Sequence, residues 1–198
     1  MRQLVFLIVF CASSSSFSQK FADKTYFIID SLDISDLNKA DSALVMERLD
    51  TYHHASSRLQ RIVKFSYIAN DLENTSVQLA YAIEALSRIR SFSEQKAKSL
   101  SDKQLRELRK AESNALMNIA MAHSHLGNHH KSLTYLYEAK EISEEIGALK
   151  QLTEILLNIG GVFYEQSNLK ESLVYHQMGA ELNLQTGDTL NALYVLNN

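Results

Sequence analysis

The chain contains no proline, no tryptophan and only six glycines among 198 residues. Proline and glycine are the residues that helix interiors tolerate least, so their scarcity favours a nearly all-helical protein. The one cysteine, Cys11, lies in the N-terminal run, so the rest of the chain can form no disulfide and offers no thiol chemistry. The formal net charge is only -3, so there is no basic field to recruit nucleic acid.

The sequence also lacks a motif for catalysis. We find no Ser-His-Asp or Cys-His arrangement and no glycine-rich phosphate loop, and we predict neither enzymatic activity nor a cofactor. Four histidines gather around Gly127, at His123, His125, His129 and His130. On a helix, His123 and His125 point to different sides, and only His125 and His129 could converge across the turn. We therefore predict no metal site and interpret these histidines as packing and surface residues.

An apolar run near the N-terminus predicts a secretory signal peptide over residues 1–18. Arg2 gives the run a positive start, the stretch from Leu4 to Ala12 is unbroken and apolar, and small polar residues follow it. The run is too short to span a bilayer, which takes about 20 residues. A cut after Ser18 would leave small residues at the positions that signal peptidase reads, and a cut after Gln19 is the alternative.

Lipoprotein processing at Cys11 is the less favoured interpretation of this leader, because the bulky Phe10 stands where a small residue is expected. No window after the leader has the length or apolarity of a membrane span. We therefore expect the mature protein to be soluble and exported, to the periplasm or, as the alternative, out of the cell.

Residues 19–57 are predicted to form a lead-in and a first helix. Ser35 is of a type preferred as an N-cap, and Asp36 would place a negative charge in the first turn, where it suits the helix dipole. From Leu37 to Tyr52, apolar residues recur mostly at three- and four-residue steps, as on one face of a helix. We expect the first helix to occupy that range.

Residues 58–110 are predicted to form a degenerate helix pair with an extended linker. The two helices are expected at Arg58–Asp71 and from Val77 to Ile89, where apolar residues again follow helical spacing. The run from Arg90 to Arg109 is mostly polar and charged, and we interpret it as the linker.

Several helix ends can be predicted from residues typical of caps and turns. Ser101 and Gln104 form a capping box, which predicts the start of a long helix that reaches about Leu126. Gly147 and Gly187 favour the positive φ that ends a helix. In the C-terminal part of the chain we expect two pairs of helices. The first helix of each pair should end near Gly127 or Ser167. The second helix of each pair should occupy Asn128–Ile146 or Asn168–Thr186.

Residues 111–198 match themselves at an offset of 40 residues. Leu116, Asn118 and Ile119 fall on Leu156, Asn158 and Ile159, and many later positions also coincide. A fixed period of this length is typical of a repeat array. We predict repeats at 111–150 and 151–190 and a partial third at 191–198. Because the third repeat stops inside its first helix, we expect the natural protein to be longer.

The pattern within each copy resembles the longer form of the tetratricopeptide repeat. The first copy reads Leu116, Asn118-Ile119-Ala120, His123, Gly127-Asn128-His129, Ser132 and Ala139; the second reads Leu156, Asn158-Ile159-Gly160, Phe163, Ser167-Asn168-Leu169, Ser172 and Gly179. The resemblance implies an all-α, right-handed superhelical solenoid of antiparallel helix pairs. It also implies small residues where helices cross closely, at Ala120/Gly160, Ser132/Ser172 and Ala139/Gly179, and large filling residues at Leu116/Leu156 and Tyr135/Tyr175.

The resemblance further implies that the first helices line a groove that binds a protein or peptide segment. The matching positions are Asn114, Met117, Asn118, Met121, Ser124 and His125 in the first copy, and Glu154, Leu157, Asn158, Gly161, Tyr164 and Glu165 in the second. In relatives that bind extended peptides, an asparagine like Asn118 or Asn158 hydrogen-bonds the ligand backbone. The equally weighted alternative is that these amides tie neighbouring helices together. No lysine or arginine occupies these positions, so a clamp for a ligand carboxylate is not expected.

An exported leader followed by such repeats also resembles the sensor region of bacterial tetratricopeptide histidine kinases and LuxR-type regulators. By this analogy the chain is predicted to be the sensing part of a signalling protein whose output domain lies beyond residue 198. A periplasmic or secreted assembly scaffold without a signalling role is the first alternative, and a helical metal-dependent enzyme is the second.

Overall fold

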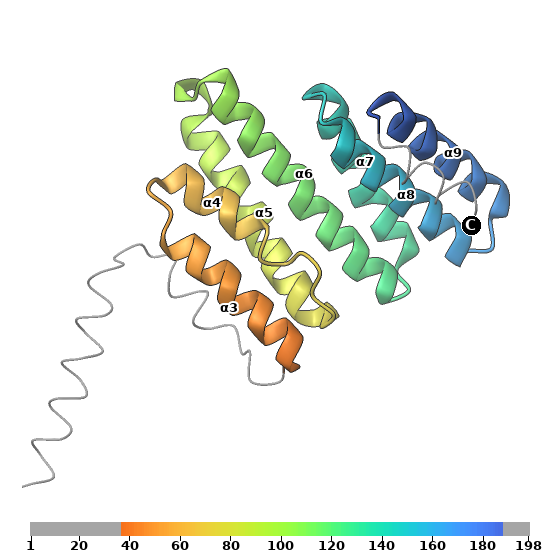
Figure 1. Ribbon diagram of the computed structural model, residues 1–198, viewed down its shortest axis with the longest axis horizontal. Helices are drawn as coiled ribbons and strands as arrows, with labels where there is room; N and C mark the ends of the chain where they lie inside the picture. The colour runs from red at the N-terminus through yellow and green to blue at the C-terminus, as the bar shows by residue number, and fades with distance from the viewer. Residues whose placement is uncertain (1–36, 188–198) are drawn as a thin grey trace, which may run out of the picture. The chain divides into compact units, whose positions relative to one another are not determined.

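The computed structural model describes residues 37–187, and these residues fold into helices joined by short turns (Figure 1). The helices are α3 (Lys39–His53), α4 (Arg58–Ser66), α5 (Thr75–Lys96), the 3-10 turn η1 (Ala97–Ser99), α6 (Asp102–His125), α7 (His129–Glu145), α8 (Leu149–Glu165) and α9 (Leu169–Gln185). The predicted signal peptide, the lead-in before residue 37 and the partial repeat at 191–198 lie outside the described residues.

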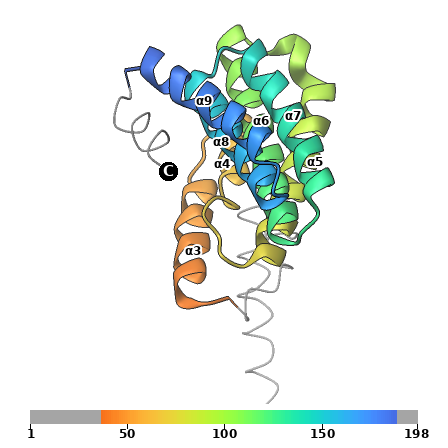
Figure 2. The ribbon, with the colours of Figure 1, turned by 90° about the vertical axis from the view of Figure 1, so that its right-hand side faces the viewer.

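Helices that follow one another in the chain lie side by side, so the pairs α4–α5, α6–α7 and α8–α9 stack in order (Figures 1 and 2). The first helices of successive pairs also contact each other, α4 with α6 and α6 with α8. A repeat that cannot bury its apolar face alone gains a core by such stacking. The predicted all-α solenoid of antiparallel helix pairs is confirmed. We call the surface formed by α4, α6 and α8 the first-helix face.

The repeat helices end as their turn residues predict. Gly127 and Gly147 adopt positive φ, at +72° and +62°. At the end of α6, the N–H of Gly127 donates to Ser124 O (2.8 Å) and the N–H of Asn128 donates to His123 O (2.8 Å). These two bonds satisfy carbonyls that a helix end leaves without a partner. The same pair of bonds recurs after α7 and α8, so each short turn reverses the chain in the same way.

Ser167 closes α8 with the same left-handed conformation, at φ 61°, where the preceding repeat has Gly127. A side chain in this region carries a conformational cost that glycine avoids. We expect Ser167→Gly to raise the free energy of unfolding by about 0.5–1 kcal/mol, a gain of roughly 1–4 °C in melting temperature. Thermal unfolding followed by circular dichroism measures it.

The reverse change, Gly127→Ser, is the matched control for Ser167→Gly. No atom lies within 4 Å of a Cβ built at Gly127, so only the backbone cost acts there. We expect Gly127→Ser to lower the melting temperature by a similar amount. A melting temperature for Ser167→Gly at or below that of the parent would contradict this account.

The predicted small positions lie where helices cross closely. Ala120, Ser132 and Ala139 are fully buried. A Cβ at Gly160 would collide with the ring of His176, and one at Gly179 would lie 2.8 Å from Cδ2 of Leu157.

The large positions lie between the helices, as predicted. Leu116 and Leu156 are buried. Tyr135 and Tyr175 are half-buried, and each stacks on an aromatic ring of the paired helix, His123 or Phe163.

The first part of the chain differs from its prediction in two places. The prediction that Ser35 caps the first helix is wrong, because α3 begins at Lys39 and its N-cap Asn38 accepts the N–H of Asp41 at 2.8 Å. The second helix, α4, ends at Ser66, five residues before the predicted end at Asp71, since the chain turns from Tyr67 onward.

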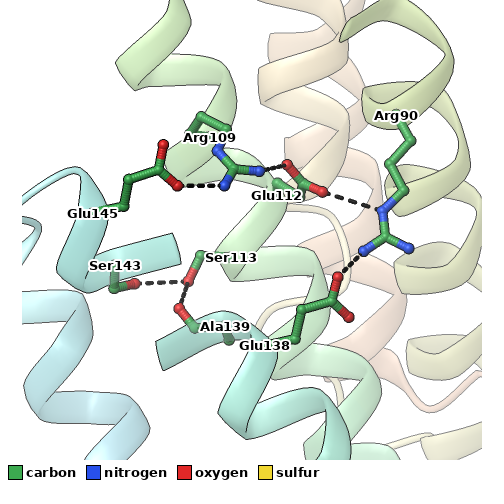
Figure 3. A network of polar contacts seen from close by, with 8 residues as sticks. All are labelled: Arg90, Arg109, Glu112, Ser113, Glu138, Ala139, Ser143 and Glu145. Atoms are coloured by element: carbon green, nitrogen blue, oxygen red, sulfur yellow. Dashed lines mark hydrogen bonds and ion pairs between the residues drawn. The ribbon is translucent and has the colours of Figure 1, made fainter. Parts of the chain in front are cut away.

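The segment predicted as an extended linker is largely helical. α5 continues through Arg90 to Lys96, and α6 starts at Asp102 behind the predicted capping box, which both of its hydrogen bonds confirm. Its charged side chains tie the helices together (Figure 3). Arg90 on α5 and Arg109 on α6 both pair with Glu112, at 3.1 Å and 2.7 Å. Arg90 also pairs with Glu138 on α7.

Candidate partner-binding face

The first-helix face carries a hollow of about 120 Å³ where α6, α7 and α8 meet. It is lined by Met121, Ser124, His125, Ser132, Leu136, Leu157, Asn158, Gly161, Val162 and Glu165. Most of the groove residues predicted on the C-terminal half of α6 and on α8 therefore surround one small cavity. Ser132 and Leu136, on α7, were not predicted as site residues, because their repeat positions indicate packing between helices.

Glu165 holds one edge of this hollow by contacts to two other helices. Ser124 on α6 donates its hydroxyl to Glu165 Oε2 at 2.5 Å, and His129 Nδ1 on α7 lies 3.3 Å from the same oxygen. The Glu165 side chain remains 46% exposed, so its carboxylate is still reachable from solvent. Sequence reasoning missed the pairing with His129, since it depends on three helices meeting at one corner.

Asn114 and Asn118 lie deep between α6 and the end of α4. Asn114 Nδ2 donates to Ser66 O at 2.9 Å and to Asn70 Oδ1 at 3.0 Å, and Asn118 Nδ2 donates to Asn70 Oδ1 at 2.6 Å. Asn118 is only 2% exposed. These contacts favour the alternative given above for Asn118: its amide joins neighbouring helices.

Asn158 occupies the same repeat position in α8 but has different surroundings. It is half-exposed and lines the hollow, and its side chain forms no hydrogen bond with another residue of the described range. Its amide is therefore available to a ligand, with both donors and an acceptor. The two asparagines that sequence symmetry makes equivalent have different surroundings in the structure.

The other predicted groove residues vary in accessibility. Met117 is buried in α6, whereas Glu154 is exposed and the Tyr164 side chain reaches 65% exposure. Met121 and Leu157 are half-buried and give the hollow its apolar wall.

A stacked aromatic pair recurs in both repeats, outside the lining of the hollow. His123 lies against Tyr135 at 5.8 Å between ring centroids, and Phe163 lies against Tyr175 at 5.6 Å. Each pair joins the first and second helix of one repeat. The 40-residue offset relates the two pairs, so this contact could have been predicted from the sequence. Burial, and then the nearby Lys131, lower the pKa of His123 below its ordinary value of 6.5.

The lowered pKa of His123 makes the stability of the fold depend on pH. As the pH falls through about 6.5, the unfolded chain takes up a proton at this residue before the folded chain does, so stability is lost on the acid side. We expect His123→Phe, which copies Phe163, to reduce the loss in unfolding free energy between about pH 7.5 and about pH 5.5. Urea unfolding at the two pH values measures it.

His130→Gln is the control for this pH dependence. His130 is an exposed histidine at the start of α7, on the other side of the turn at Gly127. This variant should keep the parent's loss of stability in acid. If His123→Phe loses as much stability as the parent over the same range, the proposed role of His123 is wrong.

The described part of the chain contains neither a cluster of metal-ligating side chains nor a helix suited to a membrane. Between residues 37 and 187, no group of three or more histidine, cysteine, aspartate or glutamate side chains is arranged to hold a metal ion. Over the same range, no helix combines the length and the apolarity needed to cross a membrane.

Comparison with known proteins agrees with the repeat pattern. Residues 112–196 match the model of the tetratricopeptide repeat family. No curated protein matches the chain. The match begins inside α6 and extends through α9, so it includes every residue that lines the hollow. The tetratricopeptide repeat is generally a non-catalytic fold for binding other proteins.

Proposed function

We propose that this chain is an exported interaction module that holds a peptide segment of a protein partner on its first-helix face. The observation that carries the proposal is the hollow at the junction of α6, α7 and α8, lined by residues that the repeat pattern assigns to a groove. The free amide of Asn158 and the reachable carboxylate of Glu165 give this hollow the polar groups that orient a ligand. The tetratricopeptide match supports a protein as the partner.

Export and a sensing role form the finer part of the proposal. They rest on the N-terminal leader pattern and on the resemblance to exported sensor regions that precede a kinase or DNA-binding output. In that arrangement, binding of a partner segment on the first-helix face would be the input signal. Fusion of the leader to a reporter enzyme that is active only outside the cytoplasm tests the export step directly, and a silent fusion would refute it.

Paired asparagine variants test the binding site. We select binders from a library of random short peptides and measure their affinity by calorimetry. Asn158→Ala is expected to weaken binding of the selected peptides by about five- to tenfold, because the amide is half-exposed and lines the hollow. Its unfolding free energy should stay within about 0.5 kcal/mol of the parent.

Asn118→Ala is the matched control at the equivalent repeat position. Because Asn118 is buried and bonded to Asn70, we expect its removal to lower the unfolding free energy by about 1–2 kcal/mol. Failure to select any peptide, or undiminished binding by Asn158→Ala, would count against the first-helix face as a peptide site.

A further inference from the structure

The hollow on the first-helix face has the size of one side chain rather than of a whole peptide. Its volume is about 120 Å³. A protein cavity of about 150 Å³ accommodates benzene, so this hollow suits the side chain of a single residue. A bound segment would lie across the face and place one residue into the hollow.

The wall and the rim of the hollow differ in chemistry. Met121, Leu136 and Leu157 supply apolar surface, and Glu165 brings a negative charge to the rim. None of the lining residues is lysine or arginine. The contacts of the Glu165 carboxylate with Ser124 and His129 both fall on Oε2, and Oε1 has no partner among the described residues. A basic side chain would bring an opposite charge to this open oxygen, which an acidic or apolar side chain cannot do.

Ser132 gives a second, independent indication of a polar ligand group. Its residue is fully buried, it lines the hollow, and its Oγ has no hydrogen-bond partner in residues 37–187. A buried hydroxyl without a partner is costly, and a polar group entering the hollow would pair with it; a donor would be accepted by Oγ. The carbonyl oxygen of Asn158 offers a further acceptor on the α8 side.

We infer that the hollow accepts a lysine or arginine side chain of the partner segment. The apolar stem of such a side chain fits against the methionine and leucine wall, while its charged end meets acceptors at Glu165, Asn158 and Ser132. The inference rests on the proposed function, since it names the side chain that the partner presents to the same site.

The test compares peptides selected from the random library against four proteins: the parent, Glu165→Gln, Glu165→Lys and the control Glu141→Gln. Glu141 is an exposed carboxylate on α7 outside the hollow lining. Peptides selected on the parent should share a lysine or arginine at one position. Replacing that residue by norleucine, which keeps the apolar stem and lacks the charge, should weaken binding to the parent about tenfold.

The variants decide whether the charge is recognised by Glu165. In Glu165→Gln, the basic and norleucine peptides should bind within about twofold of each other, whereas Glu141→Gln should keep the parent's difference. Glu165→Lys should select peptides without a basic residue at that position. Selected peptides that lack a shared basic position, or an unchanged difference in Glu165→Gln, would overturn the inference and leave the peptide site standing. Failure to select any peptide would overturn the proposed function and the inference together.

Discussion

Glu112→Gln is expected to lower the free energy of unfolding by about 2–3 kcal/mol. The Glu112 carboxylate is almost fully buried, and it accepts Arg90 Nε at 3.1 Å and Arg109 Nη1 at 2.7 Å (Figure 3). Glutamine keeps the shape but loses the charge and turns an N–H₂ group toward one of the two guanidinium groups. The two arginines retain Glu138 and Glu145 as partners, which limits the loss. Urea unfolding at neutral pH measures it.

Glu145→Gln is the matched control for Glu112→Gln. Glu145 also pairs with Arg109, at 2.6 Å, but its side chain is 64% exposed. Because solvent screens such pairs, we expect a loss below about 1 kcal/mol. Equal losses for the two variants would show that burial of Glu112 adds nothing, and the network would then contribute only as separate surface pairs.

Asp41→Asn is expected to cost about 2–4 kcal/mol. The Asp41 carboxylate is completely buried and accepts two backbone N–H groups, from Glu73 at 2.9 Å and from Asn74 at 2.8 Å. These bonds attach the start of α3 to the turn before α5. An amide can accept only with its oxygen, so one backbone N–H would face an N–H₂ group and lose its partner. Chemical unfolding compared with the parent gives the cost.

Asp50→Asn provides the comparison on the same helix. Asp50 is exposed, and its carboxylate lies 3.3 Å from Nδ1 of the exposed His54. We expect its unfolding free energy to remain within about 0.5 kcal/mol of the parent. If Asp41→Asn proves as mild as Asp50→Asn, the attachment of α3 to the following turn does not depend on this carboxylate.

The sequence predicts α6 to α9 closely because several local signals agree there. The capping box at Ser101 and the turn glycines Gly127 and Gly147 lie at the helix ends, and the 40-residue offset gives each helix two independent readings. Where only one signal is present, the prediction fails. Ser35 is a suitable cap residue, yet Asn38 takes the role because its side chain also reaches Glu73 at 3.0 Å.

Within the run from Arg90 to Arg109, the helix predicted behind the capping box is confirmed, but the continuation of α5 to Lys96 was not recognised, because the charges obscure a sparse helical pattern. Phe92 and Leu108 are buried within the run, while the arginines pair with carboxylates, two of them on α7. A polar composition predicts an exposed linker only when the charges have no partners, and partners from distant segments cannot be recognised from a single sequence.

The candidate site shows the same limit. The repeat pattern places Asn118 and Asn158 at one position, but only Asn118 has Asn70 of the preceding helix beside it. Whether the amide at this position packs or stays free therefore depends on the residue beside it in the preceding helix pair. That residue differs between the first and the second repeat. Likewise Ser132 was predicted as a packing residue, and its hydroxyl, at the hollow, has no hydrogen-bond partner within residues 37–187.

The long helix α6 has a consequence for dividing or transplanting these repeats. The repeat register starts at residue 111 and the family match at residue 112, both well inside a helix that begins at Asp102. A protein cut there would lose the capping box, the fully buried Leu108 and the partner of Glu145. The natural border of a graftable unit is the short connection before Asp102, because a unit that starts there keeps α6 whole and keeps its packing on α7.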